Sequence, residues 1–200
     1  MRSLKVIIPL VILALLVGCA KPPTADIDSA KAALQTAEQN SDVSTYAQDQ
    51  LKAAQDKLAQ LQSELDLQAK KGALSRNYDA AKNLALETRA AADALATEAE
   101  AAKEVAKNNA AAAIDELTKT LIPQAQSGIA MARRVRGIKL DFAGLTAALN
   151  QAKAQVADAQ TAYNNGQYAT ALSTADAVKS AIAQESTTVA DAISAAKASK

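Results

Sequence analysis

Apolar residues recur along most of this chain at alternating steps of three and four, which is the period of one face of an α-helix. The seam is clearest at Leu51, Leu58, Leu61 and Leu65, where it has the spacing of a coiled coil. Polar breaks divide the pattern into successive helical segments. The predicted segments are residues 24–40, 45–70, 74–136, 141–163 and 168–193.

Short polar signals mark the ends of these segments. Thr24 and Asp141 are the expected N-caps of the first and fourth segments, because their side-chain oxygens can accept from free backbone amides. Thr45 and Gln48 have the spacing of a capping box for the second segment. Glycines and cations predict the C-terminal ends. These ends are Lys70-Lys71-Gly72, Gly137 and the tight turn Asn164-Asn165-Gly166-Gln167.

The third segment is much longer than the others and contains a proline. Its seam shifts phase at Ile114, Leu117 and Leu121, just before Pro123. Proline lacks a backbone donor and crowds the preceding turn, so we expect a kink or break there. One predicted architecture is an elongated antiparallel bundle, in which two three-helix bundles share the long helix. The alternative is a compact four- or five-helix bundle that folds back at Pro123.

The only strongly apolar run lies at the start of the chain. Arg2 and Lys5 lead into the apolar stretch Val6–Val17, which ends in small residues before Cys19. This is the pattern of a secretory signal peptide, and the run is shorter than the about 20 residues of a membrane-spanning helix. Leu16-Val17-Gly18-Cys19 resembles a bacterial lipobox. The resemblance implies cleavage before Cys19, a diacylglyceryl group on its thiol and often a further acyl chain on its amine.

The lipoprotein resemblance also predicts the domain boundaries and the cellular location of the protein. It implies a signal peptide over residues 1–18 and a lipid anchor with a short tether over 19–24, followed by helical bundles over 25–110 and 111–200. Two prolines stiffen the tether. Ala20 follows the cysteine where an aspartate would resemble an inner-membrane retention signal, so we expect the outer membrane if the cell has one. Cys19 is the only cysteine, which excludes a disulfide within the chain.

Composition strengthens the helical prediction and narrows the partners. Alanine supplies 51 of 200 residues, and the chain contains one phenylalanine and no tryptophan. Alanine is the best helix former, so an all-α fold follows. Loss of Arg2 and Lys5 with the signal leaves 20 basic and 21 acidic residues. A nearly neutral chain argues against a nucleic-acid partner.

Two further resemblances concern the helical region. Tyr78-x-x-Ala81-x-x-x-Ala85 and Tyr168-x-x-Ala171-x-x-x-Ala175 match each other, either through duplication of a helical hairpin or through a chance match between alanine-rich helices. Gly166-x-Tyr168-x-x-Ala171 resembles the turn of a tetratricopeptide-type hairpin. Residues 24–100 resemble an uncharacterised family of alanine-rich helical lipoprotein domains, often found beside peptidoglycan-binding OmpA-like domains; this chain has no such second domain. The phrases that carry this likeness are Tyr46-Ala-x-x-x-Leu51-x-x-Ala54 and Asn77-Tyr78-x-x-Ala81.

Candidate chemistry is sparse. The chain has no histidine, its cysteine is assigned to lipid, and no nucleophile elbow or phosphate-binding loop occurs. We therefore predict no enzyme, no cofactor and no metal. One charge cluster lies at the end of the third segment, either as cations at a helix C-terminus or as a patch for lipid headgroups, lipopolysaccharide or an acidic partner. Its members are Arg133, Arg134, Arg136 and Lys139.

The predicted function is that of a lipid-anchored, non-enzymatic protein of the cell envelope, acting as a helical scaffold, spacer or protein-interaction module. Its predicted partners are the membrane, through the lipid on Cys19, and an envelope protein or a second copy. No small-molecule substrate is evident. The alternatives are a periplasmic carrier or chaperone of an apolar ligand or client, and a self-assembling coiled-coil lipoprotein. A large exposed apolar groove would favour the carrier.

Overall fold

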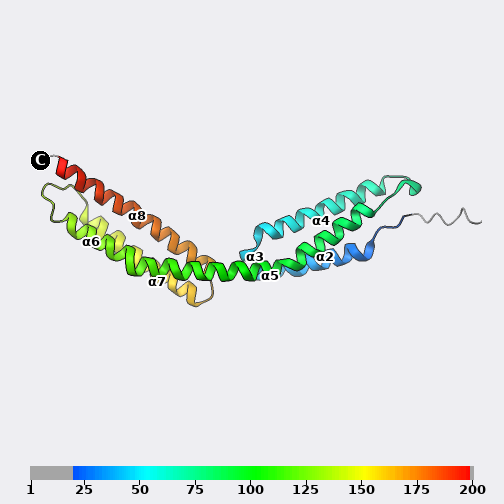
Figure 1. Ribbon diagram of the computed structural model, residues 1–200, viewed down its shortest axis with the longest axis horizontal. Coiled ribbons are helices and arrows are strands. Elements are labelled where there is room, and N and C mark those ends of the chain that lie inside the picture. The colour runs from blue at the N-terminus through cyan, green and yellow to red at the C-terminus, as the bar shows by residue number, and fades with distance from the viewer. Residues whose placement is uncertain (1–19, 199–200) are drawn as a thin grey trace, which may run out of the picture. The chain divides into compact units, whose positions relative to one another are not determined.

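The computed structural model describes residues 20–198, which form helices and short connections without a strand in that range (Figure 1). The predicted all-α helical bundle is confirmed. The signal peptide and Cys19 lie outside the described residues. The chain divides into two compact units, Met1–Ala99 and Glu100–Lys200. The sequence had placed this division at residues 110 and 111, further along the same helix.

The first unit contains α2 (Thr24–Glu38), α3 (Ser41–Tyr46), α4 (Gln48–Ala69) and the first part of α5 (Asp79–Glu116). Helices α2 and α5 run antiparallel to α4 (Figure 1). Their apolar stripes meet in two buried clusters. Near the start of α2 the buried residues are Ile27, Ala30, Leu61, Tyr78, Ala81 and Ala85. Further along they are Leu34, Ala37, Val43, Ala47, Ala54, Ala92, Leu95 and Ala99.

Two predicted N-terminal caps in this unit are wrong, although α2 begins at Thr24 as predicted. Pro23, not Thr24, occupies the N-cap position of α2, since the Pro23 carbonyl already accepts from the Ile27 amide at 3.1 Å. The capping box at Thr45 and Gln48 does not form, because the short helix α3 occupies that stretch. The Thr45 hydroxyl donates to the Ser41 carbonyl instead, at 2.8 Å.

The third predicted segment begins later than expected. Helix α4 ends at Ala69, in agreement with the predicted end at Lys70-Lys71-Gly72. A short 3₁₀ turn, η2 (Ala73–Ser75), follows, and α5 begins at Asp79 rather than Leu74. The amide of Asp79 donates to Oδ1 of Asn77 at 2.7 Å, which ties the start of α5 to the preceding polar side chain.

The second unit contains the end of α5, the π-helical segment η3 (Leu117–Leu121), α6 (Ile122–Ala132), α7 (Phe142–Asn164) and α8 (Tyr168–Ala198). Helix α7 runs antiparallel to α6 and α8, so α6 and α8 are parallel (Figure 1). One large apolar cluster joins them. Its largest members are Ile114, Leu117, Ile122, Ile129, Leu149, Val156, Val178, Ile182 and Val189.

Pro123 does not break the helical path. The helix widens into η3 just before it, and the Ile122 amide donates to the Leu117 carbonyl, five residues back. This wider turn relieves the crowding that a proline causes in a regular α-helix. Leu117 and Ile122 are both buried although they are five residues apart. The phase shift seen in the sequence is therefore absorbed by one π-helical turn.

The remaining ends of the second unit agree largely with the sequence. Helix α6 ends at Ala132, and Gly137, with φ of 78°, lies in the connection that follows. Asp141 caps α7, because its Oδ1 accepts from the amides of Ala143 at 3.1 Å and Gly144 at 2.9 Å. Gly166, with φ of 77°, makes the tight turn into α8.

Candidate functional site

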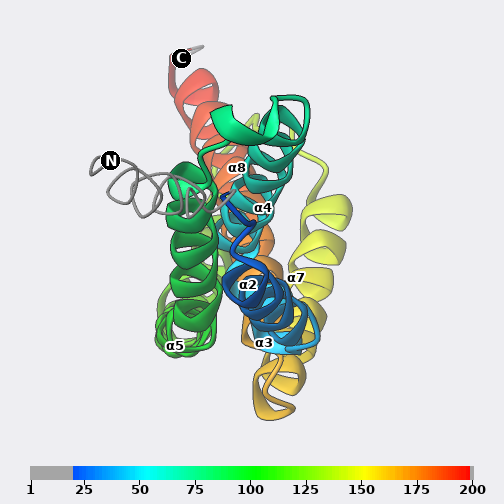
Figure 2. The ribbon, with the colours of Figure 1, turned by 90° about the vertical axis from the view of Figure 1, so that its right-hand side faces the viewer.

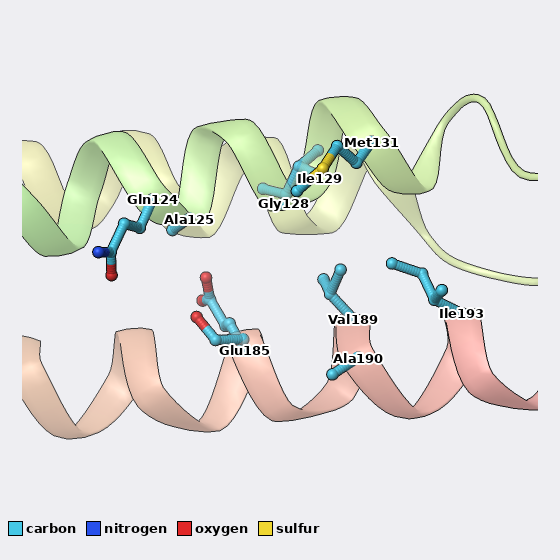
Figure 3. Close-up of a pocket in the computed structure, with 10 residues that line it drawn as sticks. Gln124, Ala125, Gly128, Ile129, Met131, Glu185, Val189, Ala190 and Ile193 are labelled. Carbon is cyan, nitrogen blue, oxygen red and sulfur yellow. The ribbon is translucent and has the colours of Figure 1, made fainter.

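A groove of about 300 Å³ lies between α6 and α8 within the second unit (Figure 3). It exists because the facing positions carry little side-chain volume. Ala125 and Gly128 come from α6, and Ala190 comes from α8. A Cβ placed on Gly128 would have no neighbour within 4 Å, so the space beside this glycine is open.

The walls of the groove are apolar and only partly withdrawn from solvent. Ile129 of α6 and Val189 of α8 are buried and belong to the main cluster of the unit. Met131 lies at the mouth with 58% of its surface exposed. Methionine is flexible and adapts to irregular partners, so its position here suits a binding surface.

One charged side chain, Glu185, enters the groove. Its carboxylate points from α8 toward α6 (Figure 3). Oε2 is buried and has no hydrogen-bond partner among the described residues. Burial raises the pKa of Glu185 above its ordinary value, because the charged form loses solvation. Glu185 as a whole is only partly buried, but one buried carboxylate oxygen without a partner is unfavourable, so this position favours an occupant that brings a cation.

Two further hollows lie in the second unit, and one of them adjoins the groove. One lies toward η3 and shares Gln124 and Ser186 with the groove; Leu121 and Lys179 also line it. Lys179 is engaged there in an ion pair, with its Nζ 2.7 Å from Oε2 of Glu116. Another hollow is lined by residues of the α6–α7 connection and of α8. The open surface therefore continues from the groove toward η3.

The predicted cationic patch divides into side chains with different surroundings. Nη2 of Arg133 donates to Oγ1 of Thr146 at 3.1 Å, and its guanidinium lies 5.0 Å from the centre of the Phe142 ring. Arg133 therefore fastens the end of α6 to the start of α7. Arg134 and Arg136 are exposed, whereas Lys139 lines the hollow beside α8. Anion binding by this cluster stays a prediction.

Two residues of the groove were not singled out from the sequence as candidate site residues. Glu185 lies on the apolar stripe of α8, between Ile182 and Val189, and a charge on such a stripe was the signal that could have found it. Gly128 lies inside the long helical pattern, and a glycine at such a position was the signal that could have indicated open space. The predicted lipidation residue, Cys19, lies outside the described residues.

Other kinds of site were sought within residues 20–198. No three acidic, histidine or cysteine side chains there are grouped so that they could hold a metal ion. None of the helices in that range combines the length and the apolar content needed to cross a membrane. Comparisons with protein-family models, with curated proteins and with solved structures found no match.

Proposed function

We propose that this chain is a lipid-anchored, non-enzymatic protein of the cell envelope whose second unit binds an apolar helix of a partner protein. The α6–α8 groove with Glu185 inside it carries the proposal for the second unit. The Leu16-Val17-Gly18-Cys19 sequence supports the anchor. Ala20 after the cysteine favours the periplasmic face of an outer membrane, in a cell that has one.

The shape of the groove supports a helix as its occupant. The groove lies between two parallel helices, and a hollow that shares Gln124 and Ser186 with it continues it toward η3. The eleven residues of α6 rise about 16 Å, so about three turns of a partner helix would cover this face. An amphipathic helix fills such a groove with apolar side chains at steps of three and four.

The charge of Glu185 restricts the sequence of the partner helix further. Oε2 of Glu185 is buried without a partner, and the residues that line the groove include no lysine or arginine. The proposed helix therefore carries a lysine or arginine within its apolar stripe, placed to meet Glu185. Pairing would restore the interactions that the carboxylate loses on burial.

A carrier function is the second candidate. A groove of about 300 Å³ is at the lower end of the volumes of small-molecule sites, and a single acidic group inside it would orient an amphiphilic amine. One physical difference separates the two candidates: a helix needs the hollow that adjoins the groove, whereas a small amine needs only the groove.

The groove is tested by crosslinking in cells. A photo-crosslinking residue at Met131 should capture a partner through an apolar peptide that contains a basic residue. Gly128→Leu fills the groove and should abolish that capture. Ala130→Leu adds the same side chain to an exposed position of α6 that does not line the groove, and should leave capture intact. Equal capture by both variants contradicts the proposal, and capture of a second copy would replace the partner by self-association.

The anchor is tested separately. Mass spectrometry of the processed protein should find a chain that begins at Cys19 and carries acyl chains. Cys19→Ala should remove both the added mass and the partition of the protein into detergent. An unmodified Cys19 in the membrane fraction contradicts the anchor while leaving the groove experiment unaffected.

A further inference from the structure

The turn between α4 and α5 in the first unit presents an isolated leucine to solvent. Leu74 is 83% exposed, compared with 54% for Leu67 and 59% for Val105. Cations flank it at Lys70, Lys71 and Arg76, and no acidic residue occurs between Leu67 and Tyr78. Single exposed leucines are common on protein surfaces, so the exposure matters only in combination with these cations and with the position of the turn.

The shape of the turn is fixed by side-chain hydrogen bonds. Nε of Arg76 donates to the Lys71 carbonyl at 3.1 Å, and its Nη2 donates to the Ala69 carbonyl at 3.2 Å. The buried side chain of Gln68 accepts from the Asn77 amide at 3.1 Å. The fold therefore holds Leu74 outward while Tyr78, four residues later, is buried.

The turn lies at the same end of the first unit as the start of α2. Ile27, near the start of α2, packs in one cluster with Tyr78 and with Leu65, near the end of α4. Figure 2 shows this end of the unit toward the viewer, with the start of α2 and the α4–α5 turn both in front. From this layer α2 extends three residues and α4 four, or about 5 to 6 Å at 1.5 Å per residue.

The tether keeps this end close to a lipid on Cys19. Five residue steps separate Cys19 from Thr24, and a fully extended chain covers at most about 18 Å in that number. Pro22 and Pro23 favour an extended and stiff path. A lipidated chain would therefore hold the α4–α5 turn within reach of the headgroup layer.

We propose that the α4–α5 turn is a second membrane contact of this protein. Leu74 enters the boundary between headgroups and acyl chains, and Lys70 and Lys71 meet the phosphates of anionic lipids. This inference rests on the proposed lipid anchor, because one leucine and a few cations bind a free chain only weakly. The anchor makes the second contact intramolecular and so raises its effective concentration.

Acidic residues at this end of the unit lie on the helices rather than in the turn, and Asp26 is in the first turn of α2. Asp66 lies on α4 before the turn and accepts from Nε2 of Gln62 at 3.2 Å. Asp79 begins α5, where a negative charge complements the helix dipole. Asp66 and Asp79 both belong to helices, and the turn between Leu67 and Tyr78 itself carries cations and Leu74 without an acidic residue.

The test uses the full lipidated protein in vesicles of phosphatidylethanolamine and phosphatidylglycerol. Since lipid occupies the Cys19 thiol, Leu74→Cys supplies one free thiol for an environment-sensitive fluorophore. Leu86→Cys is the matched control, because Leu86 is an exposed leucine of α5 in the same unit. A quencher carried on the acyl chains should quench the label at position 74 at least about twofold more than the label at position 86.

Further experiments separate the contribution of the cations from that of the lipid anchor. Lys70→Gln with Lys71→Gln should reduce the quenching at position 74 in the anionic vesicles. In vesicles of phosphatidylcholine alone, the same two substitutions should have no effect. Equal quenching at positions 74 and 86, in protein whose mass shows the lipid on Cys19, overturns the second contact and leaves the anchor standing. A Cys19 without lipid overturns both proposals, and the mass distinguishes the two results.

Discussion

The two units differ in whether their buried polar side chains have hydrogen-bond partners. In the first unit the buried side chains of Gln68 and Thr88 are both bonded: Nε2 of Gln68 donates to Oε1 of Glu64 at 2.6 Å, and the Thr88 hydroxyl donates to the Leu84 carbonyl at 2.7 Å. In the second unit Oε2 of Glu185 is buried without a partner among the described residues. The first unit is therefore internally satisfied, whereas the second retains a face suited to an occupant.

Alanine content does not explain the difference. The first unit closes tightly around alanines, and Ala30, Ala81 and Ala85 have no exposed surface. The second unit has the larger apolar cluster, yet it leaves the groove beside Ala125 and Gly128. Ala159, Ala171 and Ala175 of the second unit also have no exposed surface, so small side chains let helices approach in both units and leave space beside Ala125 and Gly128 in the second. What differs is whether the neighbouring helix comes close enough to fill the position.

The strongest test of this comparison removes a core leucine from each unit. Leu61 in the first unit and Leu117 in the second are almost completely buried. Leu61→Ala and Leu117→Ala should each lower the free energy of unfolding by about 2–5 kcal/mol, through lost burial and a residual cavity. Hydrogen exchange should locate the loss of protection in α2 and α4 for Leu61→Ala and in α7 and α8 for Leu117→Ala. The same loss in all four helices for either variant would contradict two separate cores.

Helix caps sharpen the comparison at a smaller scale. Asn40 Oδ1 accepts from the amides of Asp42 at 2.9 Å and Val43 at 3.4 Å, and Asp141 caps α7 in the same way. Each substitution by alanine should cost about 0.5–2 kcal/mol. We expect Asp141→Ala to cost more in a denaturant titration, because α7 has 23 residues and α3 has six. A larger effect of Asn40→Ala would contradict this ranking.

Glycines in the second unit should respond with opposite signs. Gly128→Ala should raise the free energy of unfolding by about 0.5–1 kcal/mol, since the site has space and alanine favours a helix. Gly166→Ala should lower it by about 1 kcal/mol, because φ of 77° is unfavourable for a residue with a Cβ. Thermal unfolding of the two variants measures both changes. A destabilised Gly128→Ala would show that the groove is narrower than described.

The smallest expected effect concerns the pH dependence that Glu185 gives to the second unit. Its pKa is raised in the folded state by burial, so the folded state binds the proton more tightly than the unfolded chain. The contribution of this group to stability is therefore lost as the pH rises from the ordinary pKa through the raised one. Glu185→Gln should raise Tm by about 1–2 °C at pH 7, and this gain should vanish below about pH 4.

A control separates this titration from a general charge effect. Glu100→Gln removes a carboxylate from the exposed surface and should not reproduce the pH-dependent gain. A Glu185→Gln variant that is less stable than the parent at pH 7 would show that the carboxylate has a partner. The same variant should weaken the crosslinking at Met131, if the captured helix carries the proposed cation.

Local signals predicted much of the fold. Lys70-Lys71-Gly72, Asp141 and Gly166 act within a few residues of themselves, and the structure places a helix end or cap where each predicts one. Thr24 and Thr45 also fit the sequence rule for a helix N-cap, but neighbouring residues occupy the cap positions instead. Pro23 supplies the first helical carbonyl of α2, and the cap at Asn40 starts a short helix across Thr45.

The groove depends on information that no single segment contains. Glu185 is visible on the stripe of α8, but its lack of a partner depends on which face α6 turns toward it. That face is set by η3, whose wider turn follows from the combination of Leu117, Ile122 and Pro123. The lipid on Cys19 stays a prediction from the first 20 residues.

The π-helical segment η3 contains one residue more than a regular α-helical turn would need at this place. Leu117 and Ile122 are separated by five positions, and removing one residue between them would restore the regular spacing of four. The second unit is therefore a helical bundle that contains an insertion without a loop. Each residue turns an α-helix by about 100°, so a single deletion acts as a rotation of α6 against its neighbours. Changes in length within this segment would alter which side chains of α6 face α8 without changing any of those side chains.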